Sequence, residues 1–534
     1  MANSNLEKGL ELPDEIWMRI VQHIPSGREG QLYGVNRSLF YIVMATRYGR
    51  VQISSLFKPR VQRMVCGLRS PYVANSIKEI EFTLGEFQKY LKFPKSQSKL
   101  DRLFNRPIPP IEPVLSVRVT LEPLSTEVDF SSQFPSLHTV YLLYRADCFS
   151  AQHYSTFLTI YKPYLQNGLK SIAKNLRSLT FDIPLEFYRD GILKKTLFFP
   201  FLEALDMSFG KISRKGNVDG SDVAPFIIRH SNTLTKLALR FRDHTPSFWA
   251  QLDGVEYFVS LLGSLCGASQ NSDLSSSLHA LSLSELTVHL PIHYVRQREL
   301  SALPNFIKRH ARTMKILDLL LHDPRVNGSA TLADHPPISL LLSDSIPSLS
   351  ALKALHIHFL YEETFLRDPE PLLACISTAA WVESLVTLDL DFNRLEQADV
   401  VQLVSQNNFS SLQSLKIKVK TLTTALFDTL AHHLPLLQSL KITTKSVQAK
   451  YPDQGAPDTS ILPSSLFLAD LQASCYSHWK SLSSLALHLI HRSHWDSWYS
   501  VGDPNWLTES QVRGVFPTVI TFDLYSWGSY EWSD

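Results

Sequence analysis

The chain has 534 residues and a net charge of +2, so its electrostatics favour neither nucleic acid nor a membrane surface as a partner. Its five cysteines lie far apart without a C-x-x-C pair, which is typical of buried thiols in a reducing compartment. The first residues are polar and no run of about twenty apolar residues occurs, so neither a secretory signal nor a bilayer span is expected. These features predict a soluble intracellular protein of the cytoplasm, the nucleus or both.

Residues 8–50 form the first predicted module, which contains two helices. The first begins near Leu12, where a proline in the first turn loses no needed hydrogen-bond donor and two acidic side chains favour the positive end of the helix dipole. Its apolar stripe consists of Ile16, Trp17, Ile20, Val21 and Ile24. The second helix is expected at residues 31–44, with an apolar side made of Leu32, Val35, Leu39, Phe40 and Val43.

This module matches a family pattern that reads L-P-x-E-I, a helix, a Leu-Pro turn and then V-x-R before an aromatic-rich helix. The matching residues are Leu12, Pro13, Glu15, Ile16, Ile20, Ile24, Pro25, Leu32, Val35, Arg37 and Phe40. The module therefore resembles an F-box, and it departs from the pattern at Glu29 and Gly30, where the family has leucines. A plain helical cap that shields the apolar edge of the first repeat is the alternative.

Residues 51–113 are expected to connect the module to the rest of the chain. Short strands are predicted at residues 51–53 and 77–84. Residues 92–113 contain five prolines, several charges and few aliphatic side chains, which predicts a loop or an insertion.

A short phrase then recurs along the chain: Leu, two spacers, Leu, one spacer and an apolar residue. Composition alone predicts roughly four such matches. The strict copies begin at Leu176, Leu202, Leu234, Leu278, Leu283, Leu352, Leu385, Leu412, Leu437 and Leu482, and looser copies begin at Ile77, Val114, Leu137, Met314 and Val519. The copy at Leu385 continues to Asn393 and Leu395 and completes the leucine-rich-repeat spacing.

Each phrase predicts a short strand whose apolar side chains point inward at every second position, preceded by a helical segment. One repeat cannot bury its own apolar face, so successive repeats must stack. Residues 114–534 are therefore expected to form an irregular α/β leucine-rich-repeat solenoid, with a parallel sheet on the concave face and helices on the convex face. Its end is rich in tryptophan, which predicts a cap on the last repeat or an aromatic recognition patch made of Trp495, Trp498, Trp506, Trp527 and Trp532.

A histidine recurs four residues before the first leucine of several copies. These histidines are His230, His310, His433 and His478. A histidine at the end of a helix can bond to the last carbonyl groups and suits the negative end of the dipole, so a structural role is predicted.

An F-box followed by leucine-rich repeats resembles the substrate receptors of SCF-type ubiquitin ligases. In that family the F-box docks on a small adaptor that leads to the cullin, and the repeats hold a protein substrate. The resemblance implies adaptor contact through Leu12, Pro13, Ile16, Ile20, Ile24, Leu32, Val35 and Leu39. A repeat scaffold without a link to a ligase is the alternative, because Glu29 and Gly30 cannot supply the buried contact of two leucines.

Strand residues between the leucines should face outward and form the binding surface. These positions include Thr180, Asp182, Asp206, Ala238, Arg240, Thr287, His289, Asp318, His356, His358 and Thr443. Two acidic positions followed by a basic ladder in the next two repeats predict a substrate site for a protein with an acidic segment, made of Asp389, Asp391, Lys416, Lys418, Lys420 and Lys441. A solvated face without a special role is the alternative.

The sequence predicts no catalytic, cofactor or metal site, and the chain is not expected to be an enzyme. It contains no G-x-S-x-G, P-loop or H-E-x-x-H motif. His488, His491 and His494 have a spacing that could mimic metal ligands, but strand alternation would put the first two on different faces. A hydrolase on an unrecognised fold is the remaining alternative.

Overall fold

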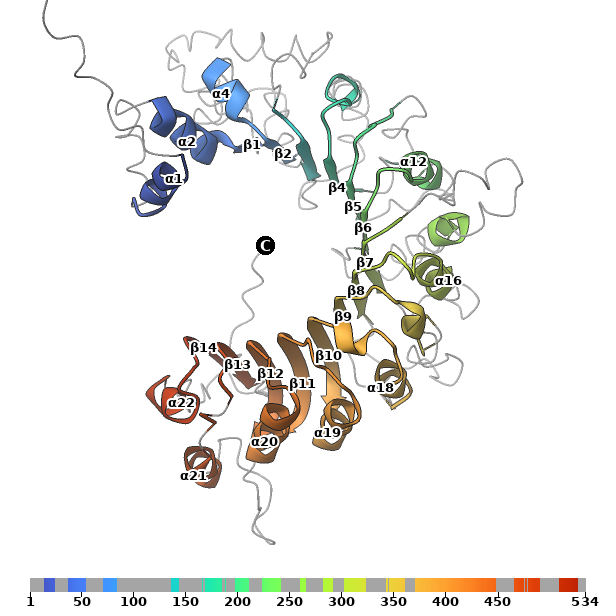
Figure 1. The fold of residues 1–534 in the computed structure, drawn as a ribbon. Coiled ribbons are helices and arrows are strands. Elements are labelled where there is room, and N and C mark those ends of the chain that lie inside the picture. The colour runs from blue at the N-terminus through green and yellow to red at the C-terminus, as the bar shows by residue number, and fades with distance from the viewer. Residues whose placement is uncertain are drawn as a thin grey trace, which may run out of the picture. The chain divides into compact units, whose positions relative to one another are not determined.

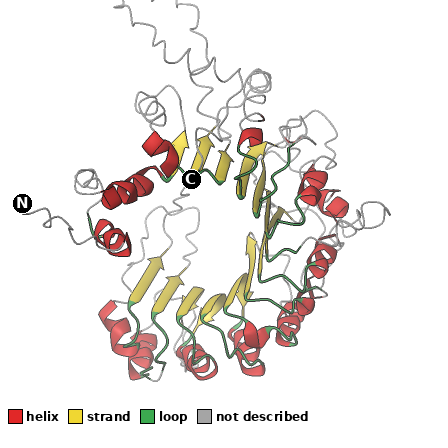
Figure 2. Cartoon of the chain, turned by 45° about the horizontal axis from the view of Figure 1, so that its top comes forward, coloured by secondary structure: helices red, strands yellow, loops and turns green. Residues whose placement is uncertain are grey.

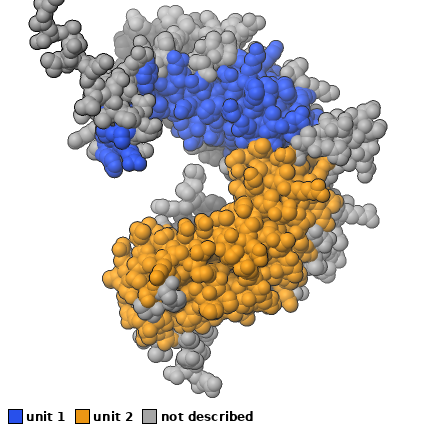
Figure 3. All heavy atoms as spheres, in the orientation of Figure 1, with its two compact units in different colours: residues 1–234, 242–250 blue, residues 235–241, 251–534 orange. Residues whose placement is uncertain are grey.

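A computed structural model of the whole chain is shown in Figure 1. It describes residues 14–24, 37–53, 71–83, 136–143, 166, 169–184, 188, 197–210, 223–241, 260–265, 282–291, 302–322, 342–343, 345–360, 370–447, 465–474, 476–477, 479–489 and 509–526. The chain forms two compact units (Figure 3). Unit 1 contains Met1–Leu234 and Arg242–Ala250, and unit 2 contains Thr235–Phe241 and Gln251–Asp534. Among the described residues, no helix has both the length and the apolar character that a bilayer crossing requires.

Unit 1 begins with helices and continues as a parallel sheet. Its helices are α1 (Asp14–Gln22), α2 (Arg37–Tyr48), α4 (Pro71–Ser76) and α12 (Val223–Arg229). Its strands are β1 (Arg50–Ile53), β2 (Glu79–Thr83), β3 (Thr139–Leu143), β4 (Ser178–Pro184) and β5 (Ala204–Gly210). Each of these strands pairs in parallel with the next one along the chain.

Unit 2 repeats the same arrangement. Its strands are β6 (Lys236–Phe241), β7 (Glu285–Pro291), β8 (Ile316–His322), β9 (Ala354–Leu360), β10 (Thr387–Leu395), β11 (Ser414–Leu422), β12 (Ser439–Val447), β13 (Ser484–Leu489) and β14 (Thr521–Ser526). They too pair in parallel and in chain order.

The helices of unit 2 cover one side of its sheet. They are α16 (Ala302–Arg309), α18 (Glu370–Ser377), α19 (Gln397–Gln406), α20 (Thr424–His433), α21 (Ser465–Ala473) and α22 (Glu509–Val515), with short 3₁₀ helices η6 (Ile346–Ser348) and η7 (Val382–Ser384). The sheet of this unit is curved and these helices lie on its outer side (Figure 2). The parallel α/β repeat architecture predicted from the leucine spacing is therefore confirmed.

The leucines of the repeated phrase form the core between the sheet and the helices. Leu388 on β10 pairs in register with Leu355 on β9 and Leu415 on β11, and all three are at most 1% exposed. Burying one such side chain stabilises the fold by about 1.5–3 kcal/mol. Because every repeat supplies leucines at the same register, each repeat covers the apolar edge of its neighbour.

Backbone hydrogen bonds between successive repeats hold them next to one another. In most of the described repeats, the carbonyl group just before the strand accepts hydrogen bonds from two successive N–H groups of the next repeat. The oxygen of Lys353, for example, accepts from Val386 at 2.8 Å and from Thr387 at 3.0 Å. The oxygen of Val386 in turn accepts from Gln413 and Ser414. These bonds give the carbonyl groups a donor from the neighbouring repeat.

The two predicted N-terminal helices overlap α1 and α2. The second runs over Arg37–Tyr48 rather than ending at residue 44, and the predicted starts at residues 12–13 and 31–36 lie outside the described residues. The strands expected at residues 51–53 and 77–84 correspond to β1 and β2. The predicted loop at residues 92–113 and the repeat copy at Val114 lie outside the described residues, as does the tryptophan-rich end.

Candidate functional site

The side chains of β9 to β12 that point away from the helices form a charged face on unit 2. Strand alternation places the leucines inside and polar residues outside, and the parallel register then aligns the polar residues across strands. Asp389 lies opposite His356 on β9 and Lys416 on β11. The charged face consists of His356, His358, Asp389, Asp391, Lys416, Lys418, Lys420 and Lys441.

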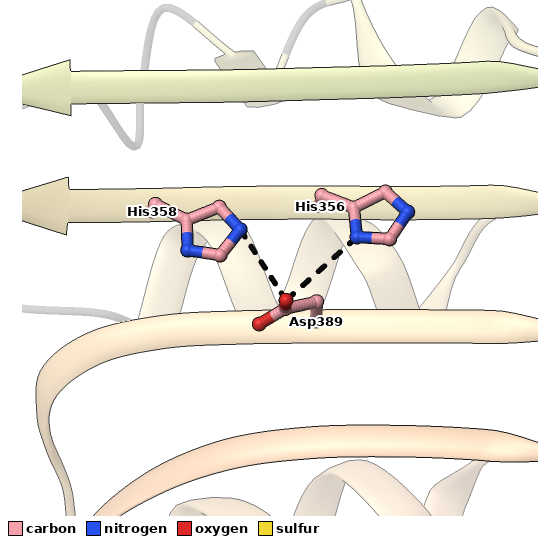
Figure 4. Close-up of side chains that lie close together, drawn as sticks. All are labelled: His356, His358 and Asp389. Atoms are coloured by element: carbon pink, nitrogen blue, oxygen red, sulfur yellow. Dashed lines mark ion pairs between the residues drawn. The ribbon is translucent and has the colours of Figure 1, made fainter. Parts of the chain in front are cut away.

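One carboxylate oxygen is the centre of the charged face. Asp389 Oδ2 lies 3.3 Å from His358 Nε2 and 3.7 Å from His356 Nδ1 (Figure 4). The ammonium group of Lys416 lies 3.1 Å from the same oxygen. The second carboxylate, Asp391, lies 3.6 Å from His358 Nδ1 and 3.5 Å from the Lys416 ammonium. Lys418 adds a further ammonium 3.7 Å from Asp391 Oδ1.

These contacts shift the proton affinities of the charged face. Burial alone would raise the pKa of Asp389, but hydrogen bonds from His356 and His358 outweigh it and hold that pKa well below its usual range. Burial lowers the pKa of His358, whereas hydrogen bonds to Asp389 and Asp391 raise it, and the resulting pKa is about 9. Burial likewise raises the pKa of Asp391, and the hydrogen bond from His358 and the nearby lysines lower it overall. The acidic groups are therefore ionised and compensated by cations at neutral pH.

The structure brings the six predicted substrate-binding residues onto one face, but their charges are not equally available. Lys416 and Lys418 pair with the aspartates, and Lys420 lies 3.1 Å from the carboxylate of Glu396 at an exposed position. Lys441 lies opposite Lys416 on β12. Burial lowers the pKa of His488 on the next strand, and the positive charge of Lys441 lowers it further. The predicted basic ladder is thus largely neutralised by its own neighbours.

The remaining outward positions follow the predicted alternation, with one exception. The positions that are half-buried on the sheet surface are Thr180, Asp206, Ala238, Arg240, Thr287, His289, Asp318 and Thr443. Asp182 is 8% exposed and counts as buried. The prediction that Asp182 belongs to an accessible binding surface is therefore wrong.

The N-terminal helices present an apolar surface. Ile16 and Ile20 on α1 are 41% and 38% exposed. On the inner side Val21 packs with Leu39 and Val43, and partly buried Trp17 and Ile42 join this core. Leu39 is 1% exposed, so the prediction that it contacts an adaptor directly is corrected to a packing role between the helices. Ile24 is half-buried, and the predicted contact residues Leu12, Pro13, Leu32 and Val35 lie outside the described residues.

The recurring histidine has the predicted structural role at His230. Its Nδ1 lies 2.7 Å from the Phe226 oxygen in its own helix, and its Nε2 accepts a hydrogen bond from the Phe199 N–H at 3.0 Å. Since Nε2 is an acceptor, Nδ1 carries the proton and donates to Phe226. His310 is also buried and contacts the Phe306 ring four residues earlier, as His230 contacts Phe226. His433 is half-buried, and His478 lies outside the described residues.

A tryptophan takes this position in another repeat, which the sequence analysis missed. Trp381 lies four residues before Leu385 and is 1% exposed. Its indole N–H donates to the Ile346 oxygen, which lies in η6 of the preceding repeat, at 2.9 Å. Near the end of unit 2, Trp479 donates in the same way to the Leu434 oxygen at 3.1 Å. The sequence contains a signal for this role, because Trp381 has the same spacing to the first leucine as the recurring histidines.

Aromatic packing closes the described end of unit 2. Tyr476 stacks on Phe516 with ring centroids 4.8 Å apart, and its hydroxyl donates to Asp428 at 2.8 Å. The five tryptophans predicted to form a cap or a recognition patch lie outside the described residues, as do His491 and His494. His488 on β13 is the register partner of Thr443 on β12 and alternates with the buried leucines of its strand, so it lies on the sheet face that points away from the helices.

Comparisons with known proteins add little to this geometry. No protein-family model and no curated protein matches the chain. Among solved structures, the chain is similar to a crystal structure of a Bacteroides fragilis protein from a structural genomics programme, at 15% sequence identity and a TM-score of 0.27. The match covers 49% of this chain and 64% of that chain. A likeness this weak carries no argument about function.

Proposed function

We propose that this protein is an F-box-like receptor that binds a partner protein through its repeats and presents it to an SCF-type ubiquitin ligase. The observation that carries the proposal is the exposure of two isoleucines on α1, a helix that precedes the parallel strands of unit 1. Ile16 and Ile20 are one helical turn apart, so their side chains share one face of the helix.

The two-helix module supports docking because α1 has two apolar surfaces, and only one of them packs against α2. Val21 on α1 packs against Leu39 and Val43 of α2, which fixes the direction of the helix. Ile16 and Ile20 are not used by this core and remain exposed. Burying each of them against an adaptor would contribute about 1.5–3 kcal/mol before the entropic cost of association.

The repeat face supports partner binding because its side chains are held on rigid strands. The charged face alternates carboxylates and ammonium groups at distances of 3.1–3.7 Å. Such a patterned surface selects a partner by charge complementarity more than by apolar burial. The protein substrate and any cullin are therefore proposed partners, and no chemistry is assigned to the chain itself.

Replacing Ile20 by aspartate should reduce adaptor binding at least tenfold, because a carboxylate would be buried against an apolar partner surface. We would measure this by affinity purification of the full chain followed by mass spectrometry of the adaptor and the cullin. The matched control is Thr46→Asp, which places the same charge at an exposed position of α2. Equal adaptor recovery with Ile20→Asp and with the unchanged chain would reject the docking proposal.

A repeat scaffold with no ligase link is the second candidate, and the departure at Glu29 and Gly30 favours it. In that case the purified chain would bring down a partner protein but neither adaptor nor cullin. Both candidates use the repeat face, so the second measurement must address that face directly.

Replacing Lys441 by glutamate should weaken capture of the partner protein several-fold, because it reverses a charge beside Lys416 on the charged face. Label-free quantification of co-purified proteins measures the change. Lys480→Glu is the control, since Lys480 is an exposed residue in the turn before β13. If both variants retain every partner at the level of the unchanged chain, the substrate does not bind at Lys441.

A further inference from the structure

We propose that His356, His358 and Asp389 bind a zinc ion on the charged face. The sequence predicts no metal site, and the proposed ligase role needs none. The inference depends on the convergence of three ligand atoms, whichever partner the face holds.

Two of the three spacings in this group are close to those of a tetrahedral zinc ion. His358 Nε2 and His356 Nδ1 lie 3.3 Å and 3.7 Å from Asp389 Oδ2, and one ligand atom from each of the three residues lies within 4.8 Å of the other two. Zinc bonds to imidazole nitrogen and carboxylate oxygen are about 2.0–2.2 Å long, so two ligands of one tetrahedron are ~3.3–3.5 Å apart. Figure 4 shows both imidazole rings directed from β9 toward the same carboxylate oxygen on β10.

The strands hold the three ligands in place. His356 and His358 are two residues apart on β9, so both point to the same side, and Asp389 is the register partner of His356 on β10. Side chains on paired strands position a metal more firmly than side chains on loops. The three side chains are 28%, 19% and 13% exposed, so an ion can reach them from solvent.

The groups around the ligands match those that usually support a zinc site. A metal-bound histidine commonly directs its other ring nitrogen at a carboxylate, which orients the ring. His358 Nδ1 lies 3.6 Å from Asp391 Oδ2, so the carboxylate is next to this nitrogen at a distance longer than a hydrogen bond. Two imidazoles and one carboxylate select zinc over magnesium and calcium, which prefer oxygen ligands.

Lys416 is the competitor for this site. Its ammonium lies 3.1 Å from Asp389 Oδ2, the oxygen that zinc would use. Zinc binding therefore requires the flexible lysine side chain to move away from the carboxylate. Removing the ammonium should tighten zinc binding, whereas it would leave a purely structural ion-pair network without its main cation. A purely structural network predicts no saturable zinc binding by the unchanged chain or by Lys416→Met, so this substitution distinguishes the two interpretations.

The experiment is calorimetric titration of the metal-free full chain with Zn²⁺, together with the visible spectrum of Co²⁺ added in its place. We expect one ion per chain and a tetrahedral cobalt spectrum. His358→Ala and Asp389→Asn should each weaken binding at least ~100-fold, and Asp391→Asn about 10–100-fold. Lys416→Met should strengthen binding several-fold. His488→Ala, on the same sheet face but outside the ligand set, is the matched control and should bind as the unchanged chain does.

Circular dichroism of each variant separates loss of a ligand from loss of the fold. If His358→Ala does not fold, Lys416→Met still decides the question, because it is expected to gain affinity. The proposal is overturned by the absence of saturable binding up to ~1 mM Zn²⁺, where any remaining affinity would be weaker than about 4 kcal/mol. It is equally overturned by binding that Lys416→Met does not strengthen, or by binding that survives in folded His358→Ala.

Discussion

Replacing Trp381 by alanine should destabilise the repeats around β10 by about 3–5 kcal/mol. The indole is 1% exposed and donates its N–H to the Ile346 oxygen, so the substitution opens a cavity and leaves a buried carbonyl without its donor. Hydrogen exchange with mass spectrometry measures the effect locally. Amides of β9 to β11 should exchange roughly two to four orders of magnitude faster, at ~1.4 kcal/mol per tenfold.

The control for Trp381 is a pair of further substitutions. Trp381→Phe keeps an aromatic ring but removes the N–H, so it should cost about 1–3 kcal/mol. Trp479→Ala removes the corresponding buried indole and its hydrogen bond to Leu434 in a later repeat. It should therefore accelerate amide exchange in β12 to β14 instead. Each repeat contacts mainly its neighbours, so the two alanine variants should perturb different segments. Identical exchange patterns from both would contradict this local coupling.

The leucine spacing was sufficient to predict the parallel repeats, because it determines both strand alternation and register. A strand that buries Leu388 and Leu390 must direct Asp389 and Asp391 to the other side. Stacked repeats place equivalent leucines opposite each other, as Leu388 and Leu415 are. The same two rules, applied to the polar positions, would have predicted Asp389 between His356 and Lys416.

The properties of the charged face depend on what lies across from each residue, and spacing within one strand does not contain that information. The sequence of β11 alone predicts that Lys416 is a free cation. In the structure, however, two carboxylates of β10 neutralise its charge. The sequence places both Leu39 and Ile20 in apolar stripes. The packing of α1 against α2 buries Leu39 and leaves Ile20 exposed. Hydrogen bonds between repeats, such as that of Trp381, join residues about 35 positions apart and depend on three-dimensional packing in the same way.

Mild acid should destabilise unit 1 through the buried His230. Burial lowers the pKa of this imidazole to about 4, from 6.5 in an unfolded chain. Between these two pH values the unfolded chain binds a proton that the folded chain does not bind. Stability therefore rises with pH across this window and is lost as the pH falls from 6.5 toward 4. From pH 7.5 to pH 5 the expected loss is about 2 kcal/mol.

His230→Gln should remove this part of the acid sensitivity, because an amide can accept from the Phe199 N–H and donate to the Phe226 oxygen without titrating. The measurement is the free energy of unfolding in urea at pH 7.5 and pH 5 for both chains. Groups that titrate in both chains cancel in the difference between them. The unchanged chain should lose about 2 kcal/mol more than the variant, while His432→Gln at an exposed position should behave as the unchanged chain. Equal losses in the unchanged chain and in His230→Gln would assign the acid sensitivity to another group.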